Sequence, residues 1–404
     1  MAKFNYTARD RDSRLISGTL EAQDKSFIVK ELKKRSLTII DIVQEDVKQK
    51  KVIQARSRGK VKPMDLVVFS RQLATLIDSG VSLITGLNIL HDQVENQYLK
   101  KIILNIKNDI EAGNSLSASF AKYPEAFPSI FSNMIRAGES SGSLNEILDR
   151  VADYLEKTEN LRRKITSSLT YPILIVGMAG LIIAFLILKV IPTFKNIFAS
   201  LGGQLPAPTQ ILIFVSDTSI KFFPFIVLAI IVIVISFNRY VSTEQGKINF
   251  DKFKLRLAVF GPIIKKICIS RFARTLATLV KSGVSILDAF EIAGKVAGNK
   301  VIEMATDQIR TNLRAGENIS GPMEETGKFP PFVVKMIAVG EQTGELERML
   351  TKISDYYETQ VNDSLNELTS LIEPIIISFL GVTIGFIVVA MFLPIFKLSQ
   401  IISK

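Results

Sequence analysis

Three long apolar runs interrupt an otherwise polar chain. They cover residues 173–190, 222–237 and 375–396, and the third contains no charged residue. A helix of about 20 apolar residues crosses the hydrocarbon core of a bilayer, so each run predicts a transmembrane helix. The second run is short for this purpose, so we expect its helix to begin earlier, near Gln210. The alternative for this run is a buried or re-entrant segment.

The polar part of the chain is duplicated. FSRQLATLIDSGVSL, from Phe69, matches FARTLATLVKSGVSI, from Phe272, at a constant offset of 203 residues. The second repeat then lacks one residue, and an offset of 202 residues holds as far as Pro192 and Pro394. The first and third apolar runs are therefore equivalent. A register kept over this distance indicates two repeats of one unit, each with its own span.

Each repeat has the periodicity of amphipathic helices. In the first, Leu73 begins a stripe of apolar residues at three- and four-residue spacing. Gly80 and Gly283 follow such stripes and fit the left-handed position after a helix. Ser82 and Ser285 fit the N-cap of the next helix. We expect a bundle of about six short helices per repeat, the last running toward the membrane.

Charge beside the apolar runs predicts the topology. The N-terminus lacks the apolar core of a signal peptide, so the chain is expected to begin in the cytoplasm. Arg162, Arg163 and Lys164 precede the first run, and further basic residues follow the second, as the positive-inside rule requires. The unmatched second span returns the chain to the cytoplasm, so both repeats lie on one side. Three spans then place the C-terminus in the periplasm or outside the cell.

The predicted fold is mainly α: an integral membrane protein with three transmembrane helices, two duplicated cytoplasmic helical-bundle domains and a small α+β N-terminal region. The predicted segments are a small N-terminal α+β region at 1–45, a basic linker at 46–62, a first cytoplasmic helical domain at 63–168, transmembrane helix 1 at 169–192, a periplasmic connection at 193–220, transmembrane helix 2 at 221–238, a second cytoplasmic helical domain at 239–372, transmembrane helix 3 at 373–396 and a C-terminal tail at 397–404.

The N-terminal region is expected to combine a β-hairpin, one helix and a further strand. Phe4, Tyr6 and Ala8 alternate as in a half-buried strand, residues 26–35 have helical composition, and 39–43 is a strand candidate. The linker after it is polar and basic. It is either a flexible connection or a contact for anionic lipid headgroups.

Composition excludes the commonest catalytic sites. The chain has one histidine, His91, and one cysteine, Cys268, far apart in the sequence, so a His-rich metal site cannot form and a Ser-His-Asp triad or a Cys-His pair is not expected. It also lacks a GxxxxGK[ST] nucleotide loop. The net charge of +11 accompanies no basic stripe with interleaved aromatics, so nucleic-acid binding is not expected. We expect no enzymatic activity and no cofactor.

A short motif occurs once in each repeat. The first form contains Gly138, Glu139, Gly142 and Leu144, and the second contains Gly340, Glu341, Gly344 and Leu346. One interpretation is an interhelical turn whose glutamate caps the next helix N-terminus. The other is an acidic contact for a partner or a divalent cation.

Small residues four apart occur in two of the predicted spans. Gly180 and Ala184 lie in the first, and Gly381 and Gly385 in the third. Such spacing allows close helix packing, within one chain or between chains. Pro172 and Pro374 are expected in the first turn of these spans, where proline is tolerated.

The doubled motifs resemble the GspF/PilC family, the inner-membrane platform proteins of bacterial type II secretion systems and type IV pili. The resemblance rests on RQLATL…SGVSL with Arg71, RTLATL…SGVSI with Arg274, the glycine-glutamate motifs, and the stretch IPTFKNIFASLGGQLPAPTQ. It covers almost the whole chain. It implies self-association as a dimer or higher oligomer, and contact with a cytoplasmic assembly ATPase, with pilin or pseudopilin subunits, with other inner-membrane assembly proteins and with membrane lipid.

The sequence bears on three classes of function. A non-enzymatic platform for pilus assembly or secretion agrees with the resemblance. A polytopic membrane transporter or channel subunit would need polar groups at the membrane midplane, and no carboxylate or histidine lies within the three apolar runs. A membrane-bound enzyme would need a catalytic cluster. The sequence leaves open whether the fibre is a type IV pilus or a secretion pseudopilus.

Overall fold

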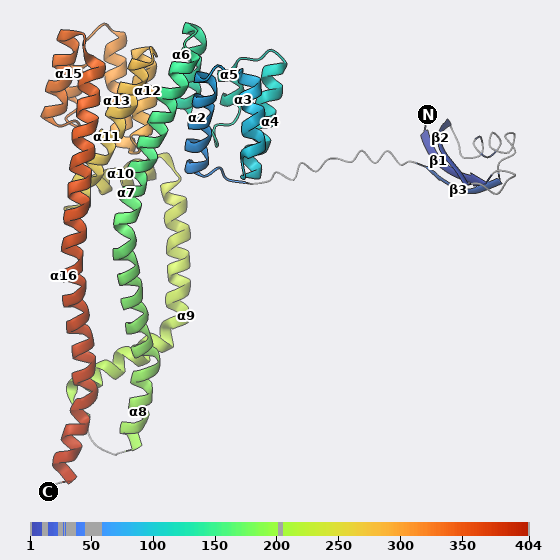
Figure 1. The fold of residues 1–404 in the computed structure, drawn as a ribbon. Coiled ribbons are helices and arrows are strands. Elements are labelled where there is room, and N and C mark those ends of the chain that lie inside the picture. Colours follow the sequence, from blue (N-terminus) through green and yellow to red (C-terminus); the bar gives the residue numbers. More distant parts are fainter. Residues whose placement is uncertain are drawn as a thin grey trace. The chain divides into compact units, whose positions relative to one another are not determined.

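The computed structural model describes residues 2–9, 15–22, 27, 29, 38–44, 59–200 and 205–402. The chain divides into two compact units, Met1–Gly59 and Lys60–Lys404, and each is described by itself. The larger unit is helical throughout its described elements and contains both repeats (Figure 1). The prediction of a mainly helical chain is therefore confirmed.

The N-terminal unit contains a three-stranded antiparallel sheet with strand order β2-β1-β3. The strands are β1 (Ala2–Arg9), β2 (Leu15–Ala22) and β3 (Thr38–Gln44). β1 is central, because Phe4 pairs with Leu20 on one side and with Gln44 on the other.

Two predicted N-terminal segments fall largely outside the described residues. The helix expected at 26–35 has only two described positions, and of the linker expected at 46–62 only residues 59–62 are described. Val61, at the end of that linker, is buried against the helical core. The compact larger unit therefore begins before its first helix.

The helices of the two repeats correspond one to one. The first repeat comprises α2 (Pro63–Asp78), α3 (Leu83–Gln93), α4 (Gln97–Glu111), α5 (Leu116–Ala121), α6 (Ser129–Ser141) and α7 (Leu144–Phe185). The second comprises α11 (Phe260–Lys281), α12 (Ile286–Val296), α13 (Lys300–Arg314), α14 (Ser320–Glu325), α15 (Pro331–Thr343) and α16 (Leu346–Ile402). Only the last helix of each repeat departs from the expected short length.

Each repeat ends in a helix that continues from the bundle into the apolar run without a break. α7 has 42 residues and α16 has 57. The expectation that Pro172 and Pro374 occupy the first turn of a span is therefore wrong, since both lie inside these helices. A proline there removes one helical hydrogen bond, a loss that neighbouring helices and hydroxyl side chains can compensate. Thr369 Oγ1 lies 3.5 Å from Ser168 O, the carbonyl that Pro172 leaves without its helical donor.

The connection between the repeats contains the remaining helices. They are the π-helical η1 (Leu186–Val190), α8 (Ile191–Ser200), α9 (Ala207–Val241) and α10 (Glu244–Arg256). α9 begins close to Gln210, as predicted, and is bent by 51° between Phe225 and Val227. Pro224 adjoins this bend and lacks the N–H that a straight helix would use there.

Two helical segments of the described chain are long and apolar enough to cross a membrane, Leu144–Ile197 and Leu346–Pro394, and the bent α9 makes a third if it crosses as one span. Their apolar side chains are largely exposed, including Ile173, Leu181 and Val382. At the end far from the bundles, Thr209 Oγ1 donates to Ala390 O and Ser216 Oγ donates to Ile187 O at 2.6 Å, which joins α9 to α16 and to η1.

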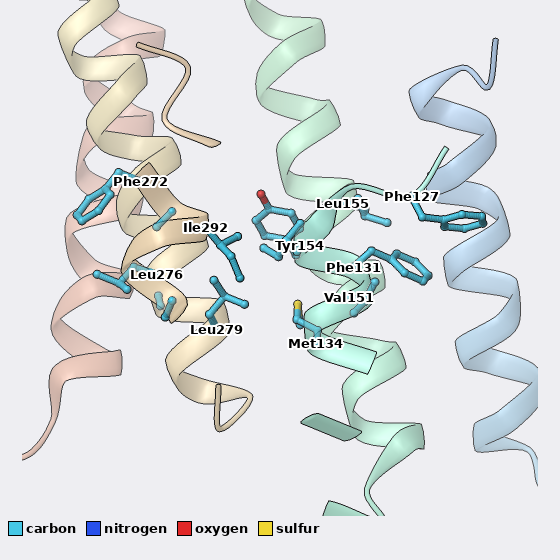
Figure 2. Packing of buried hydrophobic residues seen from close by; sticks show 14 of the residues in the cluster. Phe127, Phe131, Met134, Val151, Tyr154, Leu155, Phe272, Leu276, Leu279 and Ile292 are labelled. Carbon is cyan, nitrogen blue, oxygen red and sulfur yellow. The ribbon is translucent and has the colours of Figure 1, made fainter. Parts of the chain in front are cut away.

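In the helical bundles, one cluster of buried side chains spans both repeats. Matching aromatic pairs occur in each repeat: Phe69 and Phe127 lie 5.7 Å apart between ring centroids, and Phe272 and Phe329 lie 5.3 Å apart. Between the repeats, Tyr154 and Met134 face Leu279 and Ile292 (Figure 2). The repeats are therefore packed together through apolar side chains.

Candidate functional site

The glycine-glutamate motif forms the turn between the last two helices of each repeat. Gly142 ends α6 with φ of 71°, and Gly344 ends α15 with the same φ. A residue with a Cβ is strained in this left-handed conformation, so glycine is required at both turns. Leu144 and Leu346 begin the following helices and pack, partly buried, against the core.

The first glycine of the motif allows these two helices to touch. A Cβ added to Gly138 would lie 3.0 Å from Ile147 Cβ on α7. A Cβ added to Gly340 would lie 2.9 Å from the backbone Cα of Leu346. Both separations are shorter than an ordinary van der Waals contact, so a side chain here would push the helices apart.

The motif glutamate caps a helix, but not the next helix in the chain as the turn interpretation expected. Glu139 accepts hydrogen bonds from Leu116 N and from Ser117 N, the latter at 3.2 Å, at the start of α5. Glu341 accepts from Ile319 N and from Ser320 N, the latter at 3.0 Å, at the start of α14. The reason is tertiary: α5 packs on α6 and α14 on α15, which brings these N-termini beside the glutamates.

The two carboxylates therefore compensate the positive ends of two short helices. Glu139 and Glu341 share no hydrogen-bond partner and serve separate repeats. Across the residues that the structure describes, no group of three or more His, Cys, Asp or Glu side chains could hold a metal ion. The arrangement supports helix capping directly, whereas contact with a partner remains a prediction.

Arg71 and Arg274 occupy equivalent positions and join the first helix of each repeat to the last. Arg71 binds Glu156 through Nε at 2.7 Å and Asp149 through Nη1 at 2.7 Å, and it also pairs with Asp153. Its hydrogen bonds to Glu156 and Asp153 hold the pKa of its guanidinium above the usual value. This arginine therefore stays charged and ties α2 to α7.

Arg274 makes the same connection between α11 and α16 in a drier setting. It pairs with Glu358, the counterpart of Glu156, and lies 3.5 Å from Asp355, the counterpart of Asp153. Its side chain is 9% exposed, against 33% for Arg71. The two networks share two equivalent carboxylates, but Arg71 has a third partner, Asp149, whose counterpart is Thr351, and Arg274 is the more buried arginine.

A cavity of about 130 Å³ lies between the repeats, next to Arg274. It is lined by Arg150, Asp153, Tyr154, Lys157, Arg274, Ala277, Thr278, Lys281, Glu347, Thr351 and Ser354. Arg150 donates to the Lys281 carbonyl, which joins α7 to α11 across it. The repeat pattern did not indicate this cavity, because Arg150, Lys157 and Lys281 have different residues at the matching positions of the other repeat.

The small residues of the spans lie open in the single chain. A Cβ added to Gly180, Gly381 or Gly385 would have nothing within 4 Å, and Ala184 is exposed. These positions therefore do not mediate helix packing within the described chain. Packing between chains remains the prediction for them.

Comparison with known proteins places these features in one family. The family model for type II secretion system protein F matches residues 69–192 and again 272–394. The model for the N-terminal domain of the same protein matches residues 1–43. The two matches coincide with the two repeats and their apolar runs, which supports the duplication.

Similar full-length proteins carry two kinds of name. The type IV pilus assembly protein PilC of Thermus thermophilus is 39% identical over 407 residues, which cover 100% of both chains. PilC of Myxococcus xanthus is 37% identical over 402 residues, covering 100% of this chain and 96% of that protein. The type II secretion system protein F of Vibrio cholerae is 32% identical over 410 residues, covering 100% of both.

Proposed function

Because this chain belongs to the type II secretion system protein F family, we propose that it is a non-enzymatic platform that couples a cytoplasmic assembly ATPase to the assembly of pilin-like subunits. One observation carries the mechanism. Each helical bundle continues into an apolar helix without a break, through α7 and α16 (Figure 1). A continuous helix transmits a displacement of the bundle to the membrane, because its backbone is hydrogen-bonded along its whole length.

The partners follow from this role. The ATPase contacts the helical bundles, and pilin or pseudopilin subunits and other inner-membrane assembly proteins contact the spans. Lipid covers the exposed apolar side chains of α7, α9 and α16. The chain itself associates as a dimer or higher oligomer. Its apolar helices and its family indicate an inner-membrane protein.

Three spans support this arrangement better than two. The two helical segments that are long enough, Leu144–Ile197 and Leu346–Pro394, both leave a bundle in the same direction (Figure 1). A third crossing, through the bent α9, is needed to return the chain between them. The N-terminus and both bundles then lie in the cytoplasm, and the C-terminus lies on the other side.

A fusion experiment tests this topology. Alkaline phosphatase fused after Lys404 is expected to be active, because the enzyme folds only outside the cytoplasm, and the same fusion after Gly298 is expected to be silent. A cytoplasmic reporter fused at the same two positions should give the opposite pattern. Activity after Gly298 combined with silence after Lys404 would reverse the proposed orientation.

The fibre is proposed to be a type IV pilus, since the identity to pilus assembly proteins, 37% and 39%, exceeds the 32% to the secretion protein. A deletion strain is expected to lose surface pili and to keep normal exoprotein release, and the intact gene supplied in trans should restore the pili. Electron microscopy and assays of culture medium give the two readouts. Normal pili in the deletion strain would contradict the proposed function.

A further inference from the structure

The two repeats contact each other through different faces. The first repeat uses side chains of α6 and α7, and the second uses side chains of α11 and α12 (Figure 2). α7 also packs on α16. Tyr154 Oη lies 3.1 Å from Thr275 Oγ1 across this contact. Closer to the membrane, Leu161 of α7 is buried in one cluster with Val361 and Leu365 of α16.

The contact is not reciprocal. Tyr154 is 6% exposed, whereas Tyr356 at the matching position of the second repeat is 47% exposed. Thr275 is fully buried, whereas its counterpart Gln72 is exposed. A two-fold axis between the repeats would bury both members of each pair. The contact is therefore heterologous, with a donor face on one repeat and a receiving face on the other, and each repeat keeps one such face unused.

The unused receiving face is a groove of about 330 Å³ along α2 and α7. Its lining residues are Met64, Val67, Val68, Arg71, Gln72, Glu156, Glu159, Asn160 and Arg163. At the matching positions of the second repeat, Thr275, Val361 and Leu365 are covered by α7. The groove on the first repeat thus corresponds to the surface of the second repeat that α7 covers, but no described helix of the same chain covers the groove.

The unused donor face lies on α15 and α16. Tyr356 stacks on Phe332 with ring centroids 4.9 Å apart, and both rings are exposed, as is Val339 nearby on α15. In the first repeat the matching positions of the two rings are Tyr154 and Ile130, which are buried. Exposed, clustered aromatic side chains are typical of protein interfaces.

We propose that a second molecule of this chain covers these faces by repeating the internal contact, with the α15–α16 face of one molecule seated on the α2–α7 groove of the next. Tyr356 then meets Gln72 of the neighbour as Tyr154 meets Thr275 within the chain. This inference specifies the surface for the self-association included in the proposed function. A heterologous contact of this kind closes into a ring or continues as a chain of molecules.

Charge at the membrane side of the contact favours this occupant. Leu161, on the internal donor face, is replaced by Asp363 on the unused donor face, and Leu365, on the internal receiving face, is replaced by Arg163 in the groove. An apolar pair inside the chain thus corresponds to an acid and a base between chains. Among the described residues Asp363 has no ion-pair partner of its own, while Arg163 is held by Glu159 at 3.3 Å. Opposite charges at matching positions set partner and register.

The membrane also permits the contact. α7 and α16 leave their bundles in the same direction (Figure 1), so two molecules with one orientation in a bilayer present the two faces side by side. No molecule needs to be inverted.

Cysteine crosslinking between two differently tagged chains tests the surface. The native Cys268 is replaced by Ala in both chains, so that each chain carries a single cysteine. Burial raises the pKa of the Cys268 thiol to about 11, so Cys268 itself is not a useful crosslinking position. One chain carries Gln72→Cys and the other Tyr356→Cys, and membranes are treated with a short bismaleimide. We expect a crosslinked heterodimer. The control pair combines Lys101→Cys, on the exposed side of α4, with Tyr356→Cys. It should give at least roughly tenfold less crosslinked heterodimer.

A charge-reversal series tests the register. Asp363→Arg on the Tyr356→Cys chain should reduce the heterodimer several-fold, and Arg163→Asp on the Gln72→Cys chain should restore it, which a misfolded chain could not do. Native mass analysis of the wild-type chain in detergent is run in parallel. Oligomers without this crosslink would overturn the proposed surface and leave self-association standing, whereas a monomer would overturn both.

Discussion

Arg274→Ala is expected to lower the free energy of unfolding by about 3 kcal/mol, the largest effect we predict for one side chain. The substitution leaves Glu358 and Asp355 without their partner in the contact between α11 and α16, and it enlarges a cavity that already adjoins this arginine. Burial makes the loss costly at Glu358, which is only 22% exposed and loses its charged partner, whereas Asp355 is 56% exposed and water can replace the guanidinium there. Chemical unfolding of the purified chain in detergent measures the change.

Arg71→Ala is the matched control for this prediction. It has one ion pair more than Arg274, to Asp149, but its side chain is 33% exposed, so the expected loss is about 1 kcal/mol. The loss of unfolding free energy for Arg274→Lys should lie between those for Arg71→Ala and Arg274→Ala, because lysine keeps the charge and loses the planar, forked donor geometry. Equal losses for Arg71→Ala and Arg274→Ala would contradict the assignment of the difference to burial.

The second prediction concerns the motif glutamates. Glu139→Ala or Glu341→Ala removes the acceptor of two backbone N–H groups at the start of a short helix, which costs about 1–3 kcal/mol for each variant. The steady-state protein level and the thermal unfolding temperature in detergent should both fall in each variant. Both quantities should fall further in the double variant. The two sites belong to separate repeats, so their effects should be close to additive.

Glu139→Gln and Glu341→Gln separate capping from contact with a partner. Glutamine keeps one oxygen acceptor without the charge, so it should recover part of the lost stability. If pilus assembly then stays impaired at normal protein levels, the carboxylate also serves a partner. Wild-type assembly in the alanine variants at normal levels would show that neither the cap nor an acidic contact is needed.

Local geometry was largely predictable from the sequence. Gly80 and Gly283 adopt positive φ of 83° and 77° after their helices, as predicted from their place behind an apolar stripe. Ser82 caps α3 by accepting from Thr85 N, again as predicted, while Ser285 holds the N-cap position without a side-chain hydrogen bond. Turns and caps depend on a few consecutive residues, so a repeated pattern identifies them.

Helix continuity at the membrane was not predictable in the same way. Proline before an apolar run is compatible with the start of a helix and equally with a position inside one. The structure has Pro172 inside α7, and Thr369 Oγ1 of α16, which donates to Leu365 O at 2.9 Å, lies 3.5 Å from the carbonyl that Pro172 leaves free. The sequence contains both residues but not their proximity.

The duplication, the helical class, the apolar runs and the left-handed glycine turns follow from the sequence, since each depends on composition or spacing along the chain. The folded arrangement sets which helix each motif glutamate caps and how much more deeply Arg274 is buried than Arg71. It also decided that two similar repeats meet through different faces. The physical reason is that similar segments become inequivalent once one packs against the other, because burial depends on the neighbour as well as on the residue.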